Sequence, residues 1–207
     1  MSMPIEMITT DSELLARAGF HWRAQGGVRV LVGAQLEIDG FANGFSTRAG
    51  GCSPMPHDAL NLAGFNEDDA ANIHENRRRF LKLFRGDWRL ATCWQVHGAD
   101  VRVLRGETPG ALDTNDERCD ALTTDAQRVL LGVQTADCVP VLLGDARSGA
   151  CAAVHAGWRG TAAGIVPAAL ARMHAEYGTR AADVRACIGP AALGCCYEVG
   201  AEVIEIF

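Results

Sequence analysis

Apolar residues along the chain gather in short runs that glycine, proline or charged residues interrupt. Runs of this length are typical of buried β-strands, whereas apolar positions three and four apart are typical of helices. The runs predict strands over 28–33, 40–48, 90–96, 101–104 and 184–190. We expect 90–96 and 101–104 to pair with each other, and residues 1–26, which show neither pattern, to be peripheral.

Two segments show helical spacing. The first follows Asp68, a potential N-cap, and its apolar positions are Ala70, Ile73, Phe80, Leu81 and Phe84. The second covers 162–178, after a potential N-cap at Thr161. It contains Pro167, which predicts a kink or a helix in two parts.

The stretch QTADCVPVLLGDARSGACAAVHAGWRGTAAG, residues 134–164, reads as strands followed by the start of the second helix. We expect 139–143 and 150–154 to form an antiparallel hairpin around the turn GDARSG. This hairpin would return the chain to where it began. It would therefore set Cys138 and His155 side by side at its open end.

These elements predict an α+β fold with mixed β-sheets, because strands are many, helices are few and their order is not a regular βαβ repeat. The segments 49–67 and 105–118 are expected to be loops, and a loop as long as the first is usually functional or mobile. A further helix is expected to begin within 199–207. No linker or internal repeat divides the 207 residues, so we expect one domain over 1–207.

The composition is ordinary for a globular protein, with 48% hydrophobic and 21% charged residues. A net charge of −6 argues against nucleic-acid binding, and the basic run 76–80 is expected to be a solvated helix face. No apolar stretch is long enough to span a membrane and no signal-peptide pattern opens the chain, so we expect a cytoplasmic location. The eight cysteines are then expected to be reduced, and without a CxxC pair they form no zinc finger.

Three reactive residues end apolar runs: His97 in CWQVHGAD, Cys138 in QTADCVPV and His155 in AAVHAGWRG. The spacings are 41 residues, from 97 to 138, and 17 residues, from 138 to 155, which is too long for a local metal finger. They suit a catalytic zinc site with ligands from separate strands and a fourth position open to water or substrate. In a metal-free alternative, Cys138 is a nucleophile that His155 activates. The spacing does not separate the two interpretations.

Two arginines beside glycines are candidate anion sites. Arg48 precedes Gly50 and Gly51 in FSTRAGGCS, where a guanidinium and backbone N–H groups could together bind phosphate. Arg159 lies between glycines where the second helix is expected to start, and a helix N-terminus favours an anion. A solvated arginine in a glycine turn is the alternative for both.

Together these motifs resemble those of the YfiH family, whose members are also described as laccase-domain proteins or peptidoglycan editing factors. The matching stretches are FSTRAGGCS, LNL, QVHGADV, DALTTD, TADCVPVLL, AVHAGWRGT and IGPAALGCCYEVG, and they cover most of the chain. The chain departs from the family at His57, where a tyrosine is usual, which would alter the rim of the pocket. Relatives also continue past the position of Phe207, so we expect the domain to lack their C-terminal segment.

The resemblance implies a layered α/β/β/α fold grouped with cysteine hydrolases, and one zinc held by His97, Cys138 and His155. It implies phosphorolysis of adenosine, inosine and methylthioadenosine, together with deamination of adenosine. The residues expected to act in catalysis are Cys138, His155 and Asp137, the last as a proton-transfer group. The residues expected to bind nucleoside or phosphate are Arg48, Arg159 and Gln95.

Members of the family are also credited with copper-dependent polyphenol oxidation. Three scattered ligands cannot form a multicopper electron-transfer chain, and the six histidines contain no further His-rich cluster, so zinc is the expected cofactor. The alternative enzyme is a metal-free Cys/His amidohydrolase that edits a peptidoglycan precursor. A non-catalytic interaction domain is disfavoured, because it would have little use for three reactive residues at strand ends.

Overall fold

A computed structural model describes residues 11–54, 57–63, 68–106 and 113–207 of the chain. The helices are α1 (Asp11–Arg17), α2 (Ala34–Ile38), α3 (Ala70–Leu81), α4 (Trp158–Ala162), α5 (Ile165–Tyr177), α6 (Ala201–Ile204) and a 3-10 turn, η1 (Ala181–Asp183). The strands are β1 (Phe20–Gln25), β2 (Val28–Gly33), β3 (Phe45–Ser46), β4 (Arg89–Trp94), β5 (Val101–Val103), β6 (Asp113–Arg118), β7 (Ala121–Thr124), β8 (Val129–Leu131), β9 (Val139–Asp145), β10 (Ala150–Ala156) and β11 (Val184–Ile188). None of the helices in these ranges combines the length and apolar character that a membrane span requires.

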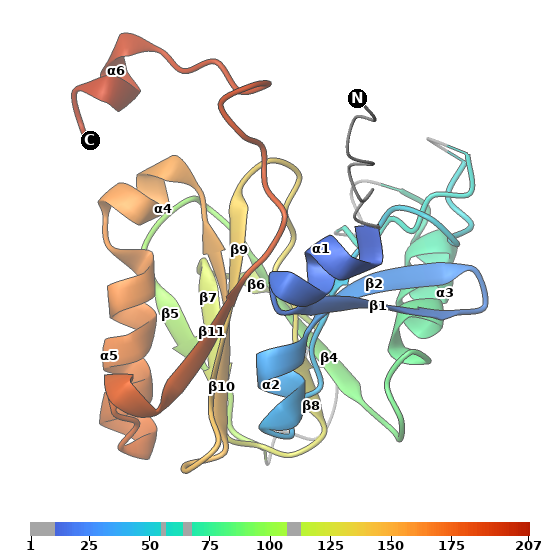
Figure 1. Cartoon of the computed structure of the whole chain (residues 1–207), viewed down its shortest axis with the longest axis horizontal. Helices are drawn as coiled ribbons and strands as arrows, with labels where there is room; N and C mark the ends of the chain where they lie inside the picture. The colour runs from blue at the N-terminus through green and yellow to red at the C-terminus, as the bar shows by residue number, and fades with distance from the viewer. Residues whose placement is uncertain (1–10, 55–56, 64–67, 107–112) are drawn as a thin grey trace, which may run out of the picture.

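The largest layer is a five-stranded sheet in the order β11-β9-β10-β7-β5. Its strands are antiparallel except for β5 and β7, which pair in parallel. The sequences of β9 and β10 are apolar along most of their length because both faces of this sheet are covered. On one face, Ile165, Ala169 and Met173 of α5 form a core cluster with Val141 and Val154 (Figure 1).

Two smaller sheets cover the other face. The sheet β6-β4-β8 is parallel, and the sheet β1-β2-β3 is antiparallel. Leu122 of β7 packs with Ala91 of β4 and Val129 of β8, so the two β layers share a core. Beyond them, Phe80 of α3 packs with Val30 of β2. The expected α+β fold, layered α/β/β/α with mixed sheets, is therefore confirmed, with α5 outermost on one side and α3 on the other (Figure 1).

The strands predicted at 28–33, 90–96, 101–104 and 184–190 are confirmed as β2, β4, β5 and β11, with small differences at their ends. The predicted pairing of 90–96 with 101–104 is wrong. β4 pairs with β6 and β8, whereas β5 pairs with β7 in the five-stranded sheet. The residues between β4 and β5 carry the chain from one β layer to the other, and so they do not close a hairpin.

Some strands carry a weak apolar signal. β1 lies in the segment expected to be peripheral, and Gly26 and Gly27, both at positive φ, close its two-residue hairpin with β2. The predicted loop 105–118 contains β6, whose sequence DTNDER is entirely polar. Of the strand predicted over 40–48, only Phe45–Ser46 forms, and the Asn43 side chain bonds the backbone of Gly33 instead. The short α2 was not predicted.

The helices differ from prediction mainly at their ends. Asp69, not Asp68, caps α3, because its side chain accepts a backbone hydrogen bond at 3.0 Å. The second helix is in two parts, as predicted, but the break falls at Gly164, which has a φ of 81°. Pro167 lies in the first turn of α5, and Thr161 lies inside α4 and caps nothing. The helix predicted within 199–207 is confirmed as α6.

The basic run at 76–80 is only partly a solvated face. Asn76 and Arg77 are buried, whereas Arg78 is exposed. Asn76 donates to the Ser53 hydroxyl at 2.8 Å and accepts from the Cys52 N–H at 2.9 Å. It therefore anchors the glycine-rich loop that follows β3. All eight cysteines are free, as predicted.

Candidate metal centre

The hairpin of β9 and β10 forms as predicted. Its ladder pairs His155 with Pro140 and Ala156 with Val139. Cys138 directly precedes Val139, so the thiol and the imidazole both lie at the open end of the hairpin.

His97 reaches the same place from the connection between β4 and β5. It has a φ of 60°, in the left-handed region, and its ring meets the His155 ring edge to face with centroids 4.8 Å apart. The possible ligand atoms of His97, Cys138 and His155 all lie within 4.8 Å of one another. Within the described ranges, this is the one group of three or more such residues.

The chemistry of this donor group fits a single zinc ion. Two imidazole nitrogens and one thiolate are common zinc donors, and the ligands of a tetrahedral zinc lie roughly 3.5 Å apart, so only a small closure is needed. Burial is graded across the group: His155 is 3% exposed, Cys138 is half-buried and His97 is exposed. Solvent or substrate can therefore reach a fourth position from the His97 side.

The environment of Cys138 also favours a cation. Burial raises the pKa of the Cys138 thiol, and the carboxylates of Asp137 and Asp120 raise it further. Without a nearby cation the thiol therefore stays protonated at neutral pH. A divalent metal reverses this, because it binds and stabilises the thiolate.

Two glycines let the start of α4 approach the donor group. A Cβ atom at Gly157 would lie 2.9 Å from His97 Cδ2 and 3.0 Å from Cys138 Sγ. A Cβ atom at Gly160 would lie 2.8 Å from the carbonyl oxygen of Gly98. Gly157 therefore allows close packing against two of the donors, and Gly160 allows it against the backbone that follows His97.

Sequence reasoning assigned no role to Asp120. This residue directly precedes β7 and is fully buried. Its carboxylate lies against His155 Nδ1 and accepts hydrogen bonds from the backbone N–H groups of Val96, His97 and Gly98. The available signal was the first letter of DALTTD, an acid placed directly before a strand of apolar and threonine residues.

Asp137 and Gln95, the polar neighbours predicted to take part in the site, differ in their exposure and hydrogen bonding. Asp137 is exposed and adjoins Cys138. The Gln95 amide donates to the carbonyl oxygen of Gln134 at 2.6 Å and accepts from the N–H of the same residue at 2.7 Å. Gln95 therefore links the end of β4 to the segment before Cys138, and these bonds occupy both ends of its amide.

The two arginines predicted to bind anions lie in different surroundings. Arg159 lies within the five-residue helix α4, exposed, with its guanidinium stacked 4.1 Å above the Trp158 ring. Arg48 is exposed, and in the described part of the chain its side chain has no ion pair. The N–H of Gly51 donates to the carbonyl of Asp58 at 2.9 Å, so it does not point to an anion. Arg159 thus lies in the first turn of α4, where it was predicted, and Arg48 presents an exposed guanidinium.

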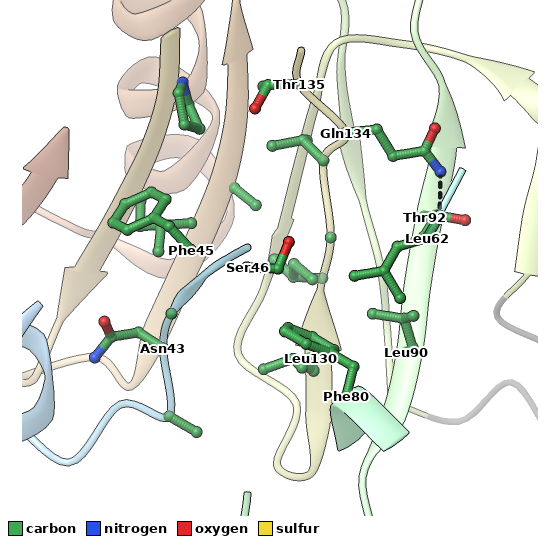
Figure 2. Close-up of a pocket in the computed structure, with 18 of the residues that line it drawn as sticks. Asn43, Phe45, Ser46, Leu62, Phe80, Leu90, Thr92, Leu130, Gln134 and Thr135 are labelled. Atoms are coloured by element: carbon green, nitrogen blue, oxygen red, sulfur yellow. Dashed lines mark hydrogen bonds between the residues drawn. The ribbon is translucent and has the colours of Figure 1, made fainter. Parts of the chain in front are cut away.

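A cavity of about 480 Å³ lies between the two β layers. Figure 2 shows Thr135 at the end of the cavity opposite Phe80 and Leu130. Most of its lining is apolar, and Arg48 is among the lining residues. Ala136 and Pro140 also line it, on either side of Cys138 in the sequence, whereas the three donors do not. The cavity therefore adjoins the donor group without containing it.

The sequence pattern of the family described as multi-copper polyphenol oxidoreductase laccase matches residues 42–207. The chain belongs to this family. The match includes all three donors and Asp120. Membership in the family does not fix the metal or the reaction.

Individual relatives agree with this assignment. A Streptomyces coelicolor protein named purine nucleoside phosphorylase is 43% identical over 84% of this chain and 70% of its own length. The crystal structure of YlmD from Geobacillus stearothermophilus has a TM-score of 0.80 at 32% identity, over 91% of this chain and 70% of that one. The Bacillus licheniformis protein YfiH has a TM-score of 0.78 at 29% identity, over 89% and 70%. The resemblance to YfiH proteins is confirmed.

The chain is shorter than these relatives. It spans 70% of the Streptomyces coelicolor protein and 62% of a Bacteroides thetaiotaomicron protein that is also named purine nucleoside phosphorylase. The activity of those whole proteins is therefore not transferred to this chain by similarity alone.

Proposed function

We propose that this protein is a zinc-dependent purine nucleoside phosphorylase. The observation that carries the proposal is the convergence of His97, Cys138 and His155 beside a cavity between the β layers. In phosphorolysis, a phosphate oxygen forms a bond to C1′ of the ribose and the C1′–N9 bond breaks. The purine leaves with the bonding electrons and takes up a proton.

The cavity supports a nucleoside as substrate. Its volume of about 480 Å³ lies within the usual range for small-molecule pockets, and its apolar walls suit a flat purine ring. Arg48 is available to bind phosphate through its planar guanidinium. The printed names of the Streptomyces coelicolor and Bacteroides thetaiotaomicron relatives point to the same reaction.

Each residue then has a defined task. His97, Cys138 and His155 would hold the zinc, which when bound supplies a Lewis acid. Asp137, an exposed carboxylate next to Cys138, would accept a proton from solvent water and relay it to N7 of the departing purine. Arg159, held against Trp158, would offer a second cationic contact for phosphate.

Adenosine, inosine and methylthioadenosine are the proposed substrates, and deamination of adenosine is a proposed second reaction. Deamination would replace the C6 amino group by a hydroxyl from water and release ammonia. The donor group also favours one zinc over a laccase centre. The single group found in the described ranges would hold one metal ion, whereas multicopper oxidation passes electrons between several.

A metal-free cysteine hydrolase is the second candidate. His155 lies next to Cys138 and contacts Asp120 at 2.8 Å. Cys138, His155 and Asp120 thus resemble the nucleophile, base and orienting acid of a catalytic triad, which favours this candidate. Its substrate would be a peptide amide of a cell-wall precursor. The raised pKa of Cys138 argues against it, because the free thiol is a poor nucleophile.

Metal analysis of the purified protein separates the two candidates. Elemental analysis should find about one zinc per chain in the wild type and far less in Cys138→Ser. Cys195→Ser is the control, because Cys195 is an exposed free thiol outside the donor group. Inosine cleavage should require phosphate and should stop when a chelator removes the metal.

Two outcomes would overturn the proposal. Full zinc occupancy in Cys138→Ser would exclude Cys138 as a ligand. Amide hydrolysis that survives complete chelation, without any phosphate-dependent release of purine, would establish the cysteine hydrolase.

A further inference from the structure

A buried carboxylate lies behind the donor group. The antiparallel ladder that pairs Ala121 with Val154 places Asp120 opposite His155. Asp120 has no solvent exposure. A carboxylate is rarely buried to this extent unless other groups satisfy its charge.

Four contacts satisfy the Asp120 carboxylate. His155 Nδ1 lies 2.8 Å from Oδ1, and the N–H of His97 donates to the same oxygen at 2.9 Å. The N–H groups of Val96 and Gly98 donate to Oδ2 at 3.2 Å and 2.7 Å. Three successive backbone N–H groups thus converge on one anion, an arrangement known as a nest.

The nest sets the backbone of His97. A φ of 60° is uncommon for a residue with a side chain, and a nest requires a left-handed residue of this kind. The buried charge of Asp120 stabilises this conformation. Because the direction of a side chain follows from its backbone, Asp120 determines where the His97 ring points.

The same residue holds His155 twice. The N–H of His155 donates to the carbonyl oxygen of Asp120 at 2.7 Å, and its ring contacts the carboxylate. An ionised carboxylate only accepts hydrogen bonds, so the ring hydrogen belongs on Nδ1. Nε2 is then left with its lone pair free for a metal.

We propose that Asp120 is a positioning residue that presets both histidines, so that the affinity for the metal depends on it. The proposal rests on the metal centre of the proposed function and requires no particular reaction. Removing a group that orients metal ligands typically lowers metal affinity by 10- to 100-fold.

The test compares Asp120→Asn with Asp145→Asn. Asp145 is also fully buried, and its carboxylate accepts from the Ser148 hydroxyl and the Arg147 N–H at the other end of the same hairpin. Zinc dissociation constants from competition with a chromophoric chelator should rise about 10- to 100-fold in Asp120→Asn and less than about twofold in Asp145→Asn. Circular dichroism and thermal unfolding of the metal-free proteins report the fold separately.

Unchanged zinc affinity in Asp120→Asn would overturn the proposal. Equal losses in the two variants would also overturn it, because Asp120 would then only support the fold. If the wild type binds no zinc, both this proposal and the proposed metal centre are wrong. If the wild type binds zinc but cleaves no nucleoside, only the proposed activity is wrong.

A measurement on the wild type decides the question even if Asp120→Asn does not fold. Nitrogen-15 histidine spectra of the metal-free protein should show the His155 ring hydrogen on Nδ1, as its contact with Asp120 requires. A hydrogen on Nε2 would mean that Asp120 does not prepare this ring for a metal.

Discussion

The two ends of the β9–β10 hairpin each lie beside a fully buried aspartate, and the two aspartates have different kinds of partner. Asp145, at the turn end, accepts from the Arg147 N–H and the Ser148 hydroxyl, two and three residues away, and Thr179 is a more distant partner. Asp120, at the open end, contacts groups 22 to 35 residues away. Asp145 closes its own turn and fastens it to Thr179, whereas Asp120 joins the two segments that carry the histidines.

This difference gives a criterion for judging buried carboxylates. Burial alone does not indicate function, because Asp120 and Asp145 are equally buried. The partners of Asp145 are backbone N–H groups, hydroxyl groups and the Arg147 guanidinium, none of which is a candidate metal ligand. One partner of Asp120 is an imidazole, whose second nitrogen remains available for chemistry.

The strongest way to test the comparison is to remove a donor at the open end. His155→Ala should abolish zinc retention, a larger effect than the 10- to 100-fold loss expected for an orienting residue. It should also destabilise the fold by about 1–3 kcal/mol, because Asp120 loses a hydrogen-bond partner in the core. Elemental analysis and urea unfolding measure the two effects. Retention of a full zinc equivalent would show that His155 is not a ligand.

A glycine at each end allows a second test. Gly157→Ala should weaken zinc binding by about tenfold or more, because the new Cβ would press on His97 and Cys138 at about 3 Å. Gly149→Ala, in the turn, meets open space but has a φ of 75°, so it should cost about 1–2 kcal/mol of stability. Chelator competition and thermal unfolding should therefore rank the two variants in opposite orders. The same order in both assays would contradict the comparison.

Metal-linked stability gives a more general test, because it needs no change at the donors. At a free zinc concentration 1,000 times the dissociation constant, binding should stabilise the native state by about 4 kcal/mol. Asp145→Asn should gain the same increment as the wild type, because its defect lies away from the donors. Unfolding in urea with and without a chelator measures the increment. An increment that disappears in Asp145→Asn would mean that the two ends are coupled.

The smallest expected effect is on the pH dependence of folding stability, through Asp145 at the turn end of the hairpin. Burial alone would raise the pKa of Asp145, but hydrogen bonds from Ser148, Thr179 and backbone N–H groups lower it below its ordinary value. This contribution to stability is therefore complete above about pH 4 and is lost as the pH falls through the lowered value. Asp145→Asn should lower the free energy of unfolding by about 1 kcal/mol at neutral pH. It should also make stability fall less steeply as the pH decreases. Urea unfolding over a range of pH measures both effects. If the acid limb is unchanged in Asp145→Asn, other carboxylates cause the loss of stability at low pH.

The sequence predicts best what local contacts decide. Cys138 and His155 are 17 residues apart across a hairpin, so the strand pattern and the turn were enough to place them together. The strand β6 escaped prediction because its residues are polar and its parallel pairing with β4 supplies no local signal. The β1–β2 hairpin carried a signal in its Gly-Gly turn, which the apolar pattern alone does not register.

Asp120 shows why the rest of the centre could not be predicted. Its role depends on the left-handed backbone of His97, and the sequence does not display a φ angle. It also depends on contacts between distant segments, which meet only when β5 and β10 pair with β7. Gln95 illustrates the reverse case, because a polar residue near the site is committed to a backbone link with Gln134.

Two of the donors lie on one hairpin and the third lies on the connection between β4 and β5, which has a consequence for the order of events during folding. A hairpin forms within microseconds, whereas contacts between distant segments form later because longer loops must close. We expect Cys138 and His155 to meet first, and His97 to join only when β5 pairs with β7 and brings residues 96–98 to Asp120. An early zinc ion would thus be held by two donors and would exchange quickly. Slow exchange would begin with the third donor, so the release rate of the metal would report when β5 has paired with β7.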